Sequence, residues 1–175
     1  MAEAARLQVA DKPDSQDICF IPEGKYYDFV TQNSLYPEPK GNFVDKNRQV
    51  IGPHQGFCHY TVGQRKGLNL ALGYPVYVTG KNAADGSVVV GPEEELYRGE
   101  LLARDINLIF MEKIEPGMKV SAKIRYRSPE VPARLYPQND GKVLVRFTEP
   151  QKAIAPGQAV VFYDEDIVLG GGTIE

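Results

Sequence analysis

The sequence has no tryptophan and only two cysteines and two histidines among its 175 residues. It also has no apolar run near the roughly 18 residues that a membrane-spanning helix needs. Residues 1–12 lack the basic start and apolar centre of a signal peptide. We therefore expect a cytoplasmic protein with no membrane partner. Because thiols stay reduced in that compartment, a structural disulfide between Cys19 and Cys58 is disfavoured.

A strong excess of either charge is also absent. The net charge is −3, with 42% hydrophobic and 25% charged residues, which are values typical of a folded domain. This balance argues against attraction of the whole surface to nucleic acid. Locally, however, residues 119–134 contain a single acid, Glu130, and five cations: Lys119, Lys123, Arg125, Arg127 and Arg134. A local basic segment of this kind can bind phosphate.

The hydrophobic pattern predicts a mainly β protein. A short helix is predicted at 25–33 from the helical spacing of Tyr26, Phe29 and Val30. Two hairpins are predicted at 42–52 and 75–91, and the charged segment 92–100 is a candidate boundary. Beyond it, six short strands are predicted at 101–110, 118–127, 131–136, 142–148, 158–163 and 167–174. Their close spacing predicts a small closed antiparallel barrel.

The predicted strand 118–127 alternates completely between apolar and polar residues. Side chains of one parity should face the core: Met118, Val120, Ala122, Ile124 and Tyr126. The other parity holds Ser121 and the cations Lys119, Lys123, Arg125 and Arg127. Alternate cations would lie roughly 6.6 Å apart, which is close to the phosphate spacing of an RNA strand. The residues alone leave open whether this face binds phosphate or is simply solvated.

Residues 53–68 hold both histidines, Cys58, and the pair Arg65 and Lys66. A zinc site is disfavoured, because Cys58 and His59 are adjacent and no C-x-x-C pair exists. Two interpretations stay open. One is an RNA-facing loop, with Arg65 and Lys66 on phosphate and Tyr60 or His59 stacking on bases. The other is a loop that packs its aromatics on the hairpins and leaves Arg65 and Lys66 in water. We expect Cys58 to be protected by its neighbours Phe57 and Tyr60.

Two further motifs are ambiguous. The glycines at 170–172 lack the following helix that a phosphate-binding loop needs, so we expect them at a barrel corner or at a close backbone approach. Cys19 follows two acids, Asp14 and Asp17, and precedes an apolar pair. A nucleophilic cysteine needs thiolate character and access. No nearby cation supplies the first, so an inert buried cysteine and a nucleophile both remain open.

Four segments, 12–24, 52–68, 122–130 and 149–174, closely resemble the tRNA-specific 2-thiouridylases. This resemblance implies three domains: an N-terminal PP-loop domain that binds ATP, a small central domain and a C-terminal β-barrel. The PP-loop signature S-G-G-x-D-S does not occur in these residues. We therefore expect 1–16 to be a remnant of the catalytic domain and linker, 17–92 a central β-rich domain with a short helix, and 97–175 an antiparallel β-barrel domain.

The resemblance also implies an activity. These enzymes transfer sulfur to C2 of the wobble uridine of tRNA, using ATP with Mg and a cysteine persulfide, and Cys19 matches the persulfide carrier. We therefore expect Cys19 to be accessible. A second family cysteine, which releases the sulfur by forming a disulfide, belongs to the PP-loop domain, and Cys58 does not match it. The implied tRNA contacts are Arg125, Tyr126 and Gln158, and more weakly Lys123, Arg127, Arg65 and Lys66.

These matches set the remaining expectations. The chain alone should bind no cofactor and should be catalytically inactive, because the ATP-binding domain is absent. Its expected partners are tRNA and a persulfide sulfur-donor protein, and we expect a monomer. The alternative is a stand-alone RNA-binding module without catalytic activity. One conflict is visible already, because the alternation places Tyr126 on the core face. Either Tyr126 lies near a strand end, or only its hydroxyl reaches the RNA.

Overall fold

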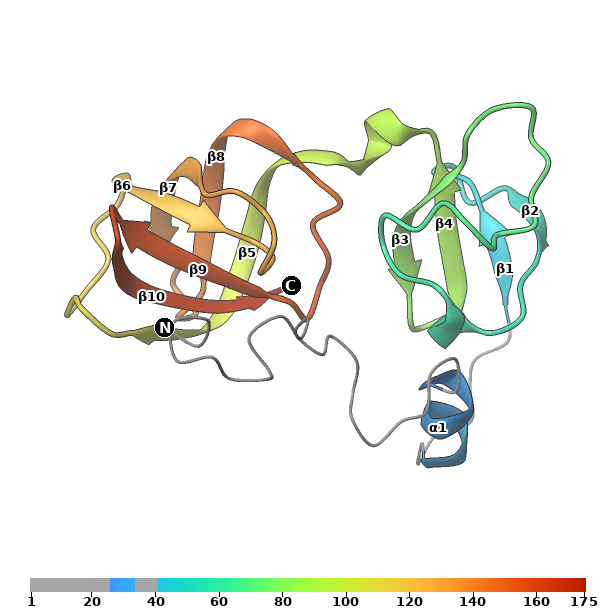
Figure 1. Cartoon of the computed structure of the whole chain (residues 1–175), viewed down its shortest axis with the longest axis horizontal. Helices are drawn as coiled ribbons and strands as arrows, with labels where there is room; N and C mark the ends of the chain where they lie inside the picture. The colour runs from blue at the N-terminus through green and yellow to red at the C-terminus, as the bar shows by residue number, and fades with distance from the viewer. Residues whose placement is uncertain (1–25, 34–40) are drawn as a thin grey trace, which may run out of the picture. The chain divides into compact units, whose positions relative to one another are not determined.

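The computed structural model describes residues 26–33 and 41–175. Residues 41–175 belong to one compact unit, which contains a four-stranded sheet followed by a closed six-stranded barrel (Figure 1). The predicted fold class is therefore confirmed. Cys19 and the segment expected to precede the central domain lie outside the described residues.

The predicted helix and both predicted hairpins are present. The helix is α1 (Tyr26–Asn33), and the sheet is formed by β1 (Asn42–Val44), β2 (Val50–Pro53), β3 (Tyr77–Asn82) and β4 (Ser87–Gly91). The strand order is β2-β1-β4-β3. The two hairpins join through a parallel pairing of β1 with β4, in which Phe43 lies opposite Val88. Both of these residues are buried in the sheet's core.

The connection from β2 to β3 spans 54–76 and is mostly irregular, apart from the single 3-10 turn η1 (Phe57–His59). It is nevertheless anchored on the sheet. Gly63 N donates to the Val78 carbonyl at 2.8 Å, and Val78 N donates to the Gln64 carbonyl at 2.9 Å. Tyr60 and Leu68 are buried in the core of the sheet. The loop therefore has a fixed path although it has little secondary structure.

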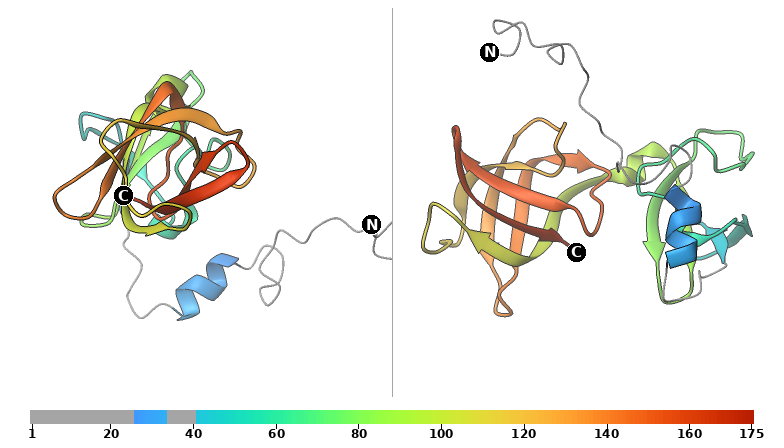
Figure 2. Two further views of the ribbon diagram at one scale, coloured as in Figure 1. Left: turned by 90° about the vertical axis from the view of Figure 1, so that its left-hand side faces the viewer. Right: turned by 60° about the horizontal axis from the view of Figure 1, so that its bottom comes forward.

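The 3-10 turn η2 (Glu93–Leu96) leads directly into the barrel. The barrel strands are β5 (Tyr97–Leu108), β6 (Met118–Lys123), β7 (Val131–Pro137), β8 (Val143–Lys152), β9 (Ala159–Asp164) and β10 (Ile167–Ile174). They close in the order β10-β5-β8-β7-β6-β9, and Figure 2 shows them from two further directions. All neighbours are antiparallel. Closure leaves these six strands without an unpaired edge.

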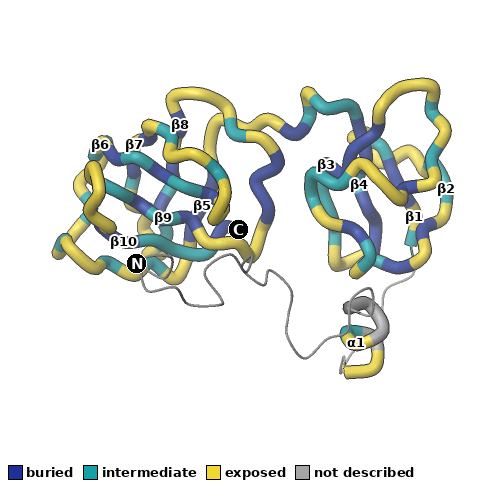
Figure 3. Tube along the Cα trace, in the orientation of Figure 1, coloured by how far each residue is buried: buried dark blue, intermediate teal, exposed yellow. Residues whose placement is uncertain are grey.

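Burial alternates along the barrel strands, as Figure 3 shows by colour. In β6, Val120 and Ala122 point into the core, and Ile124 is buried just beyond the strand. The predicted core face is thus confirmed up to Ile124. The core-face placement of Tyr126 is wrong, because β6 ends at Lys123 rather than at residue 127 and Tyr126 is 84% exposed. Of the two alternatives for this residue, a position near the strand end is the one that holds.

The early end of β6 has a local cause. Residues 124–128 form bends and a turn in which the Ser128 hydroxyl donates to the Arg125 carbonyl at 2.9 Å and accepts from Arg125 N at 3.2 Å. Pro129 follows and has no N–H to continue a strand ladder. These bonds turn the chain away from β9 and reverse the direction that strict alternation predicted for Tyr126.

The glycines of β10 lie where neighbouring backbones come close. A β-carbon on Gly170 would lie 2.5 Å from the Asn107 carbonyl oxygen, and one on Gly171 would lie 2.5 Å from the Val160 carbonyl oxygen. A side chain at either position would therefore press on strand β5 or β9. The expectation of a close backbone approach is confirmed.

Candidate nucleic-acid interface

Arg125 lies in the turn after β6 and is exposed. Its guanidinium group donates through Nη2 to the carbonyl of Ala153, which follows β8. This bond uses only part of a group that has five N–H donors. The arginine is therefore held in place while donors remain for an outside ligand.

Arg125 and Gln158 line the same cavity, of about 220 Å³, although they are far apart in the chain. Gln158 stands just before β9, where its carbonyl accepts from Ile174 N at 2.8 Å, and its side chain is exposed. Lys152, Ala153 and Ala155 from the end of β8 and the turn beyond it line the cavity as well, together with residues 61–63. Two of the predicted tRNA-contacting residues thus meet at one site.

Residues 61–63 reach this cavity because Gly63 permits it. Its φ is 91°, a left-handed value that favours glycine, and a β-carbon there would lie 2.9 Å from the Ala153 β-carbon. Gln64 fixes the next turn: its Oε1 accepts from Thr61 N at 3.0 Å, and its Nε2 donates to the Lys66 carbonyl at 3.0 Å. Gly63 and Gln64 therefore both fix the backbone path of the loop beside this cavity.

The same turn presents Arg65 and Lys66, which are both exposed. The Arg65 guanidinium carbon lies 6.0 Å from the centre of the Tyr77 ring. The burial of Tyr60 fits the packing interpretation of 53–68 and removes Tyr60 as a base-stacking residue. Both interpretations leave Arg65 and Lys66 facing outward, so their exposure does not decide between phosphate and water as what they contact.

Lys152, which lines the cavity, forms an ion pair with Glu93. Lys152 Nζ donates to a carboxylate oxygen of Glu93 in η2, and Tyr77 donates to the other oxygen at 3.2 Å. The hydrogen bond to Glu93 raises the pKa of Lys152 above its usual value. The bond from Lys152, and then that from Tyr77, lowers the pKa of the Glu93 carboxyl group. Lys152 is therefore a cation at neutral pH, partly neutralised by its partner.

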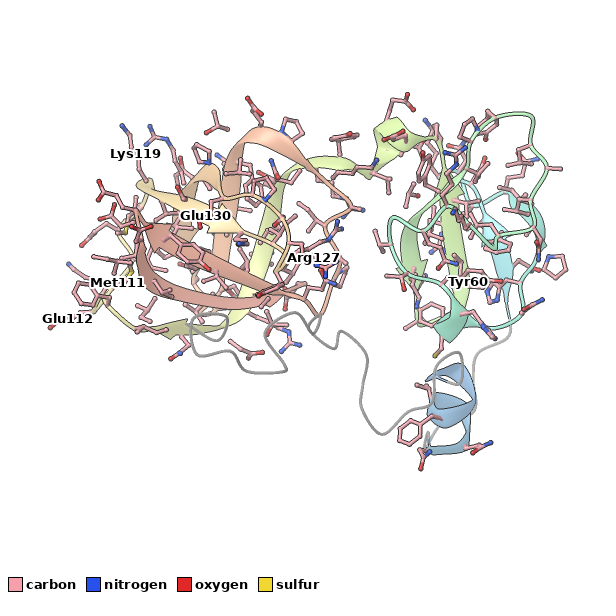
Figure 4. All side chains as sticks on the ribbon, in the orientation of Figure 1. Tyr60, Met111, Glu112, Lys119, Arg127 and Glu130 are labelled. Carbon is pink, nitrogen blue, oxygen red and sulfur yellow. The ribbon has the colours of Figure 1, made fainter. Side chains whose placement is uncertain are left out.

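Tyr126 and Arg127 continue the turn beyond Arg125, and both are exposed. Figure 4 labels Arg127 at the end of the barrel opposite to Lys119, which lies near the start of β6. Lys123, the last residue of β6, is half-buried. An exposed aromatic ring between two arginines can stack on a base while its neighbours contact phosphate.

Cys58 is exposed, so the expectation that its neighbours protect it is wrong. It lies in the single turn η1, where adjacent side chains point in different directions. Phe57 packs against the sheet core with the Lys81 amine 4.0 Å from its ring centre, and Tyr60 is buried. Cys58 between them therefore points outward.

His54 has a structural role. Its Nε2 lies 2.8 Å from the Gly86 carbonyl oxygen, and its Nδ1 accepts from Gly56 N at 3.1 Å. With both ring nitrogens bonded to backbone, this buried imidazole is suited to hold the loop rather than to ligate a metal ion.

Lys152 is a charged residue of the cavity that the sequence did not reveal. It stands in the segment 149–174 that carries the family resemblance, but its role depends on the β8 end lying beside η2. A lone lysine after a predicted strand gives no signal of that contact. The pairing becomes visible only with the register of β5 and β8, in which Tyr97 lies opposite Lys152.

Comparison with known proteins yields two family models. Residues 28–92 match the "tRNA methyl transferase PRC-barrel domain", and residues 98–174 match the "Aminomethyltransferase beta-barrel domain".

Among the described residues, no helix is both long and apolar enough to span a membrane.

Curated relatives match along the whole chain. A protein of Acetivibrio thermocellus is 51% identical over 174 residues, which is 99% of this chain and 48% of the relative. Proteins of Clostridium botulinum and Halothermothrix orenii are 47% and 44% identical over 175 residues, which is 50% and 49% of their lengths. Each is named a tRNA-specific 2-thiouridylase MnmA. The chain spans about half the length of the curated relatives it matches.

Proposed function

Because the chain belongs to the tRNA-specific 2-thiouridylase family, we propose that it is the central and C-terminal tRNA-binding part of a tRNA-uridine 2-sulfurtransferase. The whole enzyme would make 2-thiouridine at the wobble position, in the cytoplasm, using ATP. On this proposal, residues 17–92 and 97–175 act as its central and barrel domains.

One observation carries the RNA-binding part of the proposal. Arg125 and Gln158, which are 33 positions apart in the numbering, line one cavity with Lys152. Tyr126 next to Arg125 is exposed although the alternation of β6 predicted burial. Cations, an amide and an exposed ring at one place suit the phosphates and unstacked bases of single-stranded RNA.

The proposed chemistry needs a further domain and Cys19. ATP would adenylate the C2 oxygen of the uridine and release pyrophosphate. The outer sulfur of a persulfide on Cys19, loaded by a donor protein, would then attack C2, and AMP would leave with the oxygen. A second cysteine would cleave the sulfur–sulfur bond by forming a disulfide with Cys19, leaving the transferred sulfur on the uridine.

The binding part can be tested with the 175-residue chain. Fluorescence anisotropy with labelled tRNA should show binding that weakens as salt rises, because released counterions drive the association. Arg125→Glu should reduce both the affinity and the slope of log K against log salt concentration, by about 1 for each lost phosphate contact. A wild-type chain that does not bind tRNA at about 50 mM salt would refute the proposal.

A further inference from the structure

Three cations face one another across three adjacent barrel strands. The register places Lys119 of β6 opposite Arg134 of β7, and Arg134 opposite Arg146 of β8. We call Lys119, Arg134 and Arg146 the basic row. Directly opposed residues in antiparallel strands have α-carbons about 4.5–5.5 Å apart, so the row is about 10 Å long. Sequence alternation along β6 alone could not reveal it, because it runs across the strands.

All three side chains of the basic row are exposed, and two are held by contacts within the barrel. Arg134 donates from Nη1 to the Gly117 carbonyl at 3.1 Å. Arg146 donates from Nε to Glu100 at 3.1 Å, and its guanidinium carbon lies 5.2 Å from the centre of the Tyr136 ring. Ordered guanidinium groups lose less entropy when they bind a ligand.

The charges of the basic row are only partly compensated. Glu100 of β5 lies opposite Arg146 and extends the row by one acid. The Gly117 carbonyl that accepts from Arg134 has no net charge, so Lys119 and Arg134 remain neighbouring cations. Like charges directly opposite in a sheet are destabilising. The row therefore reduces the stability of the free barrel, and a bound anion would relieve that repulsion.

The basic row is separate from the cavity around Arg125 and Gln158. Lys119 and Lys123 are four residues apart in β6, or about 13 Å along the strand, and Arg125 lies beyond the strand's end. Ser121 and the half-buried Lys123 stand between the two places on the same side of β6. Figure 4 shows Lys119 at one end of the barrel and Arg127 at the other.

We propose that the basic row is a second phosphate-binding site, which contacts the backbone of the same RNA several nucleotides away from the cavity. This inference rests on the proposed function, because it takes tRNA as the ligand. Two sites joined by one polyanion bind more tightly than either site alone. The row would add affinity without reading sequence, since phosphates carry no base information.

Lys119→Glu tests the proposal, with Lys113→Glu as the matched control. Both lysines are exposed and both substitutions change the net charge equally, but Lys113 lies outside the row and pairs with Glu115 at 2.6 Å. In the 175-residue chain, Lys119→Glu should lower tRNA affinity roughly three- to tenfold at about 0.1 M salt and lower the salt slope by about 1. Lys113→Glu should leave both nearly unchanged.

The melting temperature without RNA separates binding from folding. Lys119→Glu puts an acid opposite Arg134, so the free chain should melt at the same or a higher temperature at low salt. If the Lys119→Glu variant binds RNA more weakly but is as stable as the wild type or more stable, the loss of binding cannot come from unfolding. That result supports the proposal that the basic row binds phosphate. If Lys119→Glu binds tRNA like Lys113→Glu while Arg125→Glu binds weakly, the row proposal is wrong and the proposed function stands. If the wild-type chain binds no tRNA, both are wrong.

Discussion

Gly63 lies so close to Ala153 that a single added methyl group would come within 2.9 Å of the alanine β-carbon. The two residues belong to the β2–β3 connection and to the segment after β8, so this contact ties the loop of the sheet to the end of the barrel. Ala153 also accepts the bond from Arg125 and bonds through its N–H to the Leu96 carbonyl at 2.8 Å. Ala153 thus contacts two other residues that line the candidate site, Gly63 and Arg125, and is itself anchored on Leu96.

Gly63→Ala should destabilise the chain for two reasons, the left-handed backbone and the contact with Ala153. Gly73→Ala is the matched control, because Gly73 has φ 77° and a methyl group added there would meet nothing within 4 Å. The control should lower the free energy of unfolding by about 1–2 kcal/mol, and Gly63→Ala by about 1–3 kcal/mol more. Urea denaturation measures both values. Equal effects would show that the contact with Ala153 is unimportant.

Tyr126→Ala should weaken tRNA binding without changing stability. Its ring is 84% exposed, so its removal should alter the free energy of unfolding by less than about 0.5 kcal/mol. If the ring stacks on a base, its loss should cost about 1–3 kcal/mol of binding, roughly a five- to 150-fold weaker affinity. Tyr74, 51% exposed in another loop, provides the control variant Tyr74→Ala. Equal affinities of the two variants would rule out stacking by Tyr126.

The sequence was informative about some of these features and silent about others. The alternation of apolar and polar residues correctly predicted the buried residues of β6. The run of glycines at 170–172 correctly predicted a close backbone approach, which the structure has at Gly170 and Gly171. The alternation missed the exposure of Tyr126, which the family resemblance implied, because that exposure depends on hydrogen bonds between Ser128 and Arg125 that end the strand early. Pairing across the sheet was also missed: neither the parallel contact of β1 with β4 nor the basic row leaves a periodic signal along the chain.

The ion pair between Glu93 and Lys152 should make a small, pH-dependent contribution to stability. The pKa of Glu93 is lowered from 4.5, so its contribution is present above that pH and is lost as the pH falls through the lower folded value. The pKa of Lys152 is raised from 10.5, so its contribution is lost only as the pH rises beyond that value. The stability difference between wild type and Glu93→Gln should therefore be constant near neutral pH and shrink below about 4.5.

Chemical denaturation at several pH values measures this difference. Both partners are more than one third exposed, so the effect should be small and should decrease as salt screens the pair. Glu94→Gln removes a carboxylate from the same turn and serves as the control. A Glu93→Gln difference that stays unchanged down to acidic pH would show that the ion pair does not contribute to folding.

The two cysteines should differ in their contribution to catalysis. Joined to an ATP-binding PP-loop domain, the chain should thiolate tRNA, and Cys19→Ser should abolish that activity while leaving tRNA affinity nearly unchanged. The reason is chemical: a serine hydroxyl cannot carry a persulfide, whereas the proposed RNA contacts of Arg125, Tyr126 and Gln158 do not involve Cys19.

Cys58→Ser is the matched control, since Cys58 is exposed and so can react with reagents in solution. This variant should retain thiolation, because the family resemblance assigns the sulfur carrier to Cys19. Measuring 2-thiouridine by mass spectrometry of digested tRNA distinguishes the two variants. If Cys19→Ser retains activity while Cys58→Ser loses it, the carrier has been assigned to the wrong cysteine. Because exposure and reactivity toward alkylating reagents do not identify a sulfur carrier, only transfer to tRNA can decide between them.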